Sequence, residues 1–306
     1  MTYLHGRSRK TYAQPRAESR EPRAESREPR ADKGILTPMP LDVEARVIRN
    51  TRLSSDYNVI ALAAPEIAAA VAPGQFVMVK PGRGSDPLLR RPFSVFEILR
   101  ENGRIEGITL LSKRVGVTTR MLLDAVEGDV VSCLGPLGKP FEPVDPPAEA
   151  WMVAGGVGLA PFATLTESLR ERGTHTTLFY GARSGQELFY LDWFTSRGVR
   201  LVLTTEDGSI GERGRVTVPL ERELQRASGS LTVYACGPEP MLEAVAHVSA
   251  KYGRRSQVSV ERVMGCGMGG CYSCVIPVRD KTGGHHYVRS CIGGPIFNGA
   301  DLVWDA

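Results

Sequence analysis

Short apolar runs alternate with turn residues between Leu41 and about Phe141. Their length and alternation are typical of β-strands, and the pair Asn102-Gly103 between two of them predicts a hairpin turn. One helix is expected at 119–126, where a threonine is available as its N-cap. The expected strands are 43–48, 58–64, 75–80, 93–99, 105–111 and 129–134. Strands at this spacing predict a small antiparallel β-barrel.

The pattern changes after the proline-rich stretch 143–147. Strand-like and helix-like segments now alternate, which predicts a parallel, doubly wound α/β sheet. The expected strands are 151–154, 177–181, 199–204, 231–235 and 258–262, and the expected helices are 161–172, 188–197, 218–225 and 241–252.

The last segment, about 45 residues long, is rich in Gly and Cys and poor in long apolar side chains. Such a piece cannot bury enough core to fold alone, so we expect its cysteines to hold it together. The predicted fold is therefore multi-domain. It comprises a tail at 1–34, a β-barrel domain at 35–145, a doubly wound α/β domain at 146–256 and a small C-terminal domain at 257–306.

The excess positive charge is confined to the N-terminal tail. Residues 1–34 contain nine Lys or Arg and five Asp or Glu, which accounts for the whole net charge of +4. The heptad PRAESRE occurs twice there, at 15–21 and 22–28, and nothing in it can form a core. We expect a disordered repeat tail on a neutral folded body, and no nucleic-acid partner.

Targeting signals and membrane spans are not expected. No apolar stretch follows the basic residues of the tail, its acids argue against a transit peptide, and no run of about 18 apolar residues occurs. Four of the six cysteines are crowded near the end of the chain and are not spread along it as a disulfide framework would be. This distribution fits a reducing compartment. We therefore expect a cytoplasmic protein with no membrane partner.

Four cysteines form the most specific motif of the chain. Cys266, Cys271 and Cys274 have the spacing C-x4-C-x2-C, and Cys291 follows after sixteen residues. This spacing is typical of a plant-type 2Fe-2S cluster, and glycines between the first two cysteines let the backbone approach it. The alternative is a structural zinc site, which usually has two C-x2-C pairs. Cys133 is expected to be a small buried residue in a strand.

A glycine-rich turn follows the first strand of the α/β region. Gly155, Gly156 and Gly158 allow a tight turn and close approach of a diphosphate, which the amides of the next helix would favour. The other interpretation is a turn that serves backbone geometry alone. A second turn, 236–238, ends a later strand, and ligands of doubly wound sheets lie beyond such strand ends.

These motifs, in this order and together with Arg91-Pro-Phe-Ser94, resemble the ferredoxin-NADP reductase superfamily. The resemblance is strongest to electron-transfer subunits of NAD-linked (class 1B) dihydroorotate dehydrogenases. It implies bound FAD, a 2Fe-2S cluster held by the four cysteines, and NAD(H) as co-substrate. The implied cofactor-binding residues are Arg91, Pro92, Phe93, Ser94, Leu111, Ser112, Lys113, Thr118, Thr119, Gly155, Gly156, Gly158, Cys236, Gly237 and Pro238. The chain departs from the family at Thr118, where glycine is usual, and within 135–140, where a proline stands at a position that is commonly glycine.

The resemblance also implies a function in pyrimidine biosynthesis. The chain would pass electrons between the FMN of a dihydroorotate dehydrogenase catalytic subunit and NAD⁺, through its own cluster and FAD, in a heterotetramer of two copies of each subunit. No catalytic site for dihydroorotate is recognisable, so the isolated chain should not oxidise it. The same motifs would serve a sulfide dehydrogenase, a ferredoxin-using transhydrogenase or a hydrogenase. A zinc-stabilised, non-enzymatic binding module is the alternative from another class.

Overall fold

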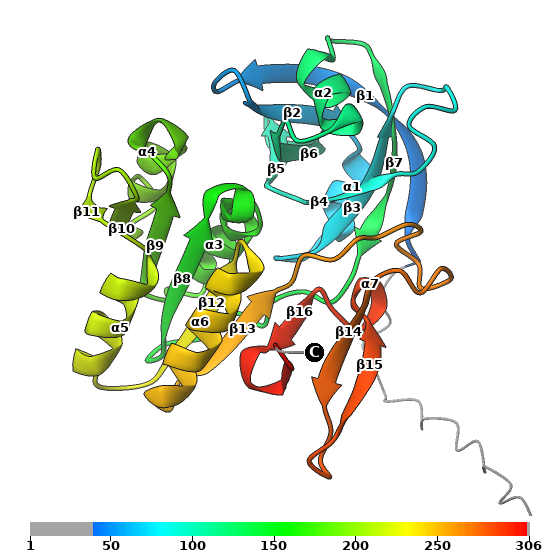
Figure 1. The fold of residues 1–306 in the computed structure, drawn as a ribbon. Helices are drawn as coiled ribbons and strands as arrows, with labels where there is room; N and C mark the ends of the chain where they lie inside the picture. Colours follow the sequence, from blue (N-terminus) through cyan, green and yellow to red (C-terminus); the bar gives the residue numbers. More distant parts are fainter. Residues whose placement is uncertain (1–38, 305–306) are drawn as a thin grey trace, which may run out of the picture. The chain divides into compact units, whose positions relative to one another are not determined.

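The computed structural model describes residues 39–304 (Figure 1). The expected disordered tail at 1–34 lies outside this range. Two seven-stranded sheets and one two-stranded sheet organise the described part of the chain. None of its helices has both the length and the apolar character that a membrane span requires.

The first sheet is antiparallel, and its strands run in the order β4-β3-β7-β1-β2-β6-β5. It curls around an apolar interior that includes Val47, Ile60, Val79 and Cys133. Cys133 is fully buried, which confirms its structural role. The end strands β4 and β5 do not pair with each other, so the barrel stays open. The strands are β1 (Leu41–Arg52), β2 (Tyr57–Ala63), β3 (Phe76–Pro81), β4 (Arg91–Ser94), β5 (Glu97–Glu101), β6 (Arg104–Lys113) and β7 (Val130–Leu137).

The prediction of a single strand at 93–99 was wrong. This segment forms two strands: β4 pairs with β3, and β5 pairs with β6. Phe96 lies between β4 and β5 in the chain and is buried. Changing partners requires a break in the strand, which periodicity alone does not reveal.

Two helices accompany this sheet. Helix α1 (Pro65–Ala70) was not expected from the sequence, and α2 (Val117–Asp124) begins two residues before its predicted start. The amide of Asn50 donates to the carbonyl oxygens of Leu122 and Ala125 at 3.0 and 2.8 Å, which satisfies acceptors at the end of α2. The end of α2 is thereby fixed against the sheet.

The second sheet has the order β11-β10-β9-β8-β12-β13-β16, and all of its pairs are parallel except β13 with β16. Helices α3 and α4 pack on one face, and α5 and α6 on the other. This is the expected doubly wound arrangement. Its elements are β8 (Glu149–Gly155), α3 (Pro161–Glu171), β9 (Thr176–Ala182), α4 (Leu191–Thr195), β10 (Arg200–Thr205), β11 (Glu212–Arg213), α5 (Thr217–Arg226), β12 (Leu231–Cys236), α6 (Glu239–Lys251) and β13 (Arg255–Ser259).

Helix α4 is shorter than the predicted helix at 188–197. Tyr190 precedes it with a φ of 62°, in the left-handed region, which delays the start of the helix. The Tyr190 ring meets Phe96 of the first sheet edge to face, with 4.7 Å between ring centroids. Packing between the two sheets therefore overrides the local helical pattern.

The C-terminal segment does not fold apart from the rest, as expected from its composition. Strands β14 (Val275–Arg279) and β15 (His285–Arg289) form a hairpin, followed by α7 (Ser290–Gly293) and β16 (Ile296–Asn298). Strand β16 pairs antiparallel with β13 and completes the second sheet. Figure 1 shows the hairpin and α7 beside the lower edge of the first sheet.

Candidate cofactor and electron-transfer site

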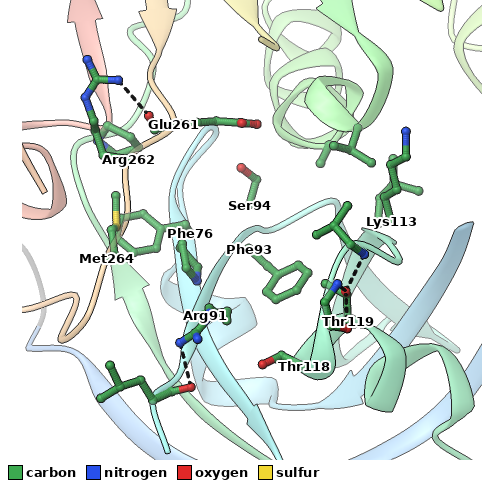
Figure 2. A pocket seen from close by; sticks show the side chains of 18 of the residues that line it. Phe76, Arg91, Phe93, Ser94, Lys113, Thr118, Thr119, Glu261, Arg262 and Met264 are labelled. Carbon is green, nitrogen blue, oxygen red and sulfur yellow. Dashed lines mark hydrogen bonds between the residues drawn. The ribbon is translucent and has the colours of Figure 1, made fainter. Parts of the chain in front are cut away.

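A cavity of about 750 Å³ lies between β4, β6 and the start of α2 on one side and the residues that follow β13 on the other. Figure 2 shows the side chains that surround it. Nine of the residues expected to bind FAD or nucleotide line this cavity: Arg91, Pro92, Phe93, Ser94, Leu111, Lys113, Thr118, Thr119 and Cys236. The motif on β4 and the turn after β12 are far apart in sequence and meet here.

One end of this cavity suits a diphosphate. Within residues 39–304, the guanidinium of Arg91 donates only to the carbonyl oxygens of Leu89 and Arg90, each at 3.1 Å, whereas neighbouring Arg90 is paired with Asp42. The first-turn amides of α2 lack intrahelical acceptors and favour negative charge. The Thr119 hydroxyl accepts from the Gly116 amide at 3.0 Å, so this side chain shapes the loop before the helix.

The rest of this cavity is largely apolar and open. Four large apolar side chains remain exposed along its lining, namely Leu88, Leu89, Val115 and Val117. Exposed apolar patches of this kind favour a ligand with flat, apolar rings that would cover them. The donors at one end and the apolar lining elsewhere together fit FAD.

Ser112 is the predicted flavin residue whose side chain does not line the cavity. Side chains alternate across a strand, so Leu111 and Lys113 of β6 point into the cavity while Ser112 is buried on the other face. Its hydroxyl has no hydrogen-bond partner within residues 39–304.

Two titratable groups at this cavity have displaced pKa values. Burial raises the pKa of the Cys236 thiol to about 12, so it is neutral at physiological pH. Burial also raises the pKa of the Glu261 carboxyl, which lies just beyond β13. Raised carboxyl pKa values at a cavity wall are common where protons are exchanged.

A second cavity, of about 510 Å³, opens at the carboxyl ends of β8, β9 and β12. Gly155, Gly156 and Pro238 line it, as expected for the nucleotide turn. Lys113 and Glu261 line both cavities. The two cavities therefore adjoin, as hydride transfer between a flavin and a nicotinamide requires.

Gly158 and Gly237 support this second cavity without lining it. A Cβ on Gly158 would lie 2.1 Å from the carbonyl oxygen of Cys236, so only glycine lets the two turns approach. Gly237 has a φ of 155°, and its Cβ would lie 2.6 Å from the Met241 methyl carbon. Both glycines determine how closely the turns after β8 and β12 approach.

Acidic side chains surround one part of the second cavity. Arg183 is paired with the Glu187 carboxylate, and Glu206 follows the end of β10. The Glu206 amide donates to the Ala182 carbonyl at 3.1 Å, which brings these turns together. In doubly wound dinucleotide-binding sheets, an acidic residue at a comparable place typically accepts a hydrogen bond from the ribose 2′-hydroxyl of NAD. The exposed Arg215 faces the same cavity.

The four predicted cluster cysteines differ in their exposure to solvent. Cys266 is half-buried, and the Cys271 sulfur lies 3.1 Å from the Ser273 hydroxyl. Cys274 and Cys291 are buried, whereas Cys271 is exposed. In the part of the chain that the structure covers, no three metal-binding side chains converge tightly enough for a single ion. The spacing of the four cysteines therefore remains the argument for a cluster over a zinc site.

Cys271 and Cys291 differ in their acidity. Hydrogen bonds from the side chain and backbone of Ser273 and from Cys266 lower the pKa of Cys271 to about 6. Burial raises the pKa of Cys291 to about 12, so a thiolate there needs the compensating charge of a metal. The donor set therefore suits a cluster with one solvent-facing pair and one buried pair.

The buried cysteine pair is in apolar contact with the wall of the first cavity. Cys274 and Cys291 pack in one cluster with Phe76 and Met264, together with Met78, Leu134 and Leu137. Phe76 and Met264 also line the first cavity, and Figure 2 shows them on the same side of it. A contiguous set of side chains thus joins the cluster site to the proposed flavin site.

Sequence reasoning missed several lining residues, notably Phe76, Glu206, Glu261 and Met264. Phe76 and Met264 carry no motif, and only tertiary packing brings them to the cavity. Glu206 and Glu261 follow the carboxyl ends of β10 and β13. That position could have marked both as candidates.

Comparison with known proteins agrees with this arrangement. Residues 261–303 match the family model described as the iron-sulfur cluster binding domain of dihydroorotate dehydrogenase B. Residues 152–247 match the oxidoreductase NAD-binding domain. The dihydroorotate dehydrogenase B (NAD(+)) electron transfer subunit of Desulforamulus reducens is 35% identical over 242 residues, which cover 79% of this chain and 90% of that relative.

This chain belongs to the family of dihydroorotate dehydrogenase B electron transfer subunits. The family member from Geobacillus kaustophilus is 37% identical over 233 residues, covering 76% of this chain and 86% of its own. The expected resemblance is thereby confirmed.

Solved structures extend the comparison. A chain from the structure of the NADH-dependent reduced ferredoxin-NADP oxidoreductase, a protein of flavin-based electron bifurcation, is 27% identical to this chain. Its TM-score is 0.75, and the match covers 86% of this chain and 91% of that chain. A ferredoxin NADP⁺ reductase from Neisseria gonorrhoeae, 18% identical with a TM-score of 0.59 over 69% of this chain and 92% of its own, shares the fold. The predicted fold class is therefore confirmed: a curled antiparallel sheet, an α/β nucleotide-binding sheet and a C-terminal iron-sulfur segment.

Proposed function

We propose that this chain passes electrons between the FMN of a dihydroorotate dehydrogenase catalytic subunit and NAD⁺, through a 2Fe-2S cluster and FAD. The observation that carries the proposal is the shared packing of Phe76 and Met264, which belong to one apolar cluster with Cys274 and Cys291 and also line the flavin cavity. When bound, FAD exchanges a hydride with nicotinamide and single electrons with the cluster.

Different residues of the chain would bind different parts of the two cofactors. Arg91 and the first turn of α2 would hold the diphosphate of FAD. Lys113 and Glu261 line both cavities, so they would contact the nucleotide and the flavin where the two cavities adjoin. Glu261 retains its proton to higher pH than an ordinary carboxyl, which supports a role in holding a proton beside the flavin.

The solvent-facing side of the cluster site supports a partner protein there. Cys271 is exposed, and the same segment exposes the large apolar side chains Val263, Met268 and Tyr272. Electron exchange with a partner requires a short path from the cluster, and the exposed pair provides it. The proposed partner is the FMN-containing catalytic subunit, in a cytoplasmic heterotetramer of two copies of each subunit that serves pyrimidine biosynthesis.

A second candidate is the FAD and 2Fe-2S subunit of a ferredoxin-linked transhydrogenase. It is favoured by the likeness to the NADH-dependent reduced ferredoxin-NADP oxidoreductase chain, of which 91% is covered. The two candidates differ in the partner protein and not in the chemistry of this chain.

The test is reconstitution under anaerobic conditions with and without the catalytic subunit of the same organism. We expect dihydroorotate-dependent reduction of NAD⁺ by the complex, and none by the isolated chain. Met264→Ala should slow electron transfer from dihydroorotate to NAD⁺ severalfold while leaving bleaching of the flavin by NADH unchanged, and the exposed Met39→Ala serves as control. Formation of orotate by the isolated chain, or copurification with a different catalytic subunit only, would overturn the proposal.

A further inference from the structure

Arg289, at the end of β15, reaches across to the loop that carries the first three cysteines. Its guanidinium donates to the carbonyl oxygen of Gly269 at 2.8 Å and lies 4.7 Å from the centroid of the Tyr272 ring. Cys291 follows two residues later. One half-buried side chain therefore connects the loop of the first three ligands to the segment of the fourth.

The loop that Arg289 contacts has an uncommon backbone. Gly267 and Gly269 have φ values of 74° and 80°, and Tyr272 has a φ of 58° although it carries a side chain. A residue other than glycine adopts this conformation at a cost of about 1 kcal/mol or more, and only when its surroundings hold it there. Arg289 contacts two of these three positions, so it helps to keep the loop in the shape that brings the thiols together.

Arg289 also carries a positive charge that no carboxylate within residues 39–304 neutralises. Thirteen ion pairs join described residues, and Arg289 is in none of them. Each one-electron reduction of a four-thiolate 2Fe-2S cluster adds one negative charge to a group that is already anionic. A fixed cation beside it therefore favours the reduced form, the more so because half-burial limits screening.

We propose that Arg289 is a positioning residue that sets the reduction potential of the cluster. Its contacts with Gly269 and Tyr272 fix the cysteine loop, and its unpaired charge raises the potential so that the cluster accepts an electron from the partner more readily. This inference rests on the proposed function, because it requires that the four cysteines hold a 2Fe-2S cluster.

The test is a redox titration of the full-length, cofactor-loaded protein, followed by electron paramagnetic resonance. In Arg289→Gln, the ratio of reduced to oxidised cluster at a fixed potential should fall about tenfold, which corresponds to about 59 mV for one electron. Arg289→Lys keeps the charge and should keep most of the wild-type potential. Arg279→Gln, an exposed position on the same hairpin, should leave the potential unchanged.

The outcomes separate a charge effect from mere support of the loop. An unchanged potential in the cluster-containing fraction of Arg289→Gln, even with a reduced iron content, would overturn the inference, as would equal shifts in the Gln and Lys variants. If Arg289→Gln does not retain any cluster, Tyr272→Ala decides. That variant keeps the charge but exposes it to water, so it should lower the potential by a smaller amount, and no shift would refute the inference. A wild-type protein without a 2Fe-2S signal would refute the proposed function itself.

Discussion

The guanidinium of Arg183 is paired with the Glu187 carboxylate at the edge of the nucleotide cavity. An arginine at this place could meet the 2′-phosphate of NADPH, but the pairing with Glu187 removes the charge of Arg183 from that role. Glu206 adds a further negative charge on the same side. Glu187 and Glu206 therefore oppose a 2′-phosphate at this edge of the cavity, whereas Arg215 on the same cavity would attract one, and we predict that the two carboxylates prevail and favour NADH over NADPH.

We predict that Glu206→Gln combined with Glu187→Gln strengthens NADPH binding. Removing two carboxylates relieves repulsion of the 2′-phosphate and frees Arg183, which should lower the Kd for NADPH roughly tenfold, with a smaller change for NADH. Kd values for both nucleotides from fluorescence titration provide the measurement. Glu223→Gln, in an ion pair with Arg200 that does not line the cavity, should change neither value. Equal effects on both nucleotides would contradict this account of selectivity.

Cys271→Ser should abolish the cluster and leave the flavin bound. Cys271 is a predicted iron ligand, whereas the flavin cavity is lined by other residues. Iron and flavin quantitation with a visible spectrum gives the measurement. Cys133→Ala is the matched control: this thiol is buried in the first sheet, so its loss should cost about 1 kcal/mol of stability and no iron. A colourless wild-type protein that contains zinc would refute the cofactor assignment.

Glu261→Gln should change how stability depends on pH. Because burial raises the pKa of Glu261, the folded protein holds this proton to higher pH than the unfolded chain does. The free energy of unfolding therefore decreases as pH rises from the ordinary carboxyl pKa through the raised one, and then levels off. The Gln variant lacks this decrease, so its advantage over the wild type should grow across that window, by less than about 1 kcal/mol because the side chain keeps an exposed edge.

Denaturant midpoints measured at several pH values would test this prediction. Glu127 is an exposed glutamate outside both cavities, so the denaturant midpoints of Glu127→Gln should change with pH as those of the wild type do. An advantage of Glu261→Gln that shrinks as pH rises would mean that the carboxyl pKa is lowered and not raised.

Gly158→Ala should destabilise the protein and weaken NADH binding. The added Cβ would lie 2.1 Å from the Cys236 carbonyl oxygen, so the turns after β8 and β12 must separate, at a cost of about 1–3 kcal/mol. Thermal unfolding and NADH titration measure the two effects. Gly84→Ala adds the same atom where nothing lies within 4 Å and should change neither. Wild-type stability and NADH affinity in Gly158→Ala would show that the contact is dispensable.

The sequence predicts the chemistry of this protein better than its geometry. Spacing identifies Cys266, Cys271, Cys274 and Cys291 as a group because a cluster demands several thiolates in a short segment. The alternation of strands and helices predicts the α/β sheet for a similar reason, since both signals are local. Phe76 and Met264 could not be predicted as a connection between two cofactor sites, because 188 positions of chain separate them and only packing makes them neighbours.

Strand β16 has a consequence for how the protein is made. It covers the outer edge of β13, and Leu302 forms a bridge with Val278 of the hairpin, so the last residues of the chain close the second sheet. During synthesis, β13 leaves the ribosome with an unprotected edge and stays so until the entire cysteine-bearing segment has emerged. Unprotected edges favour aggregation. Emergence of the whole cysteine-bearing segment therefore determines when the edge of β13 becomes protected.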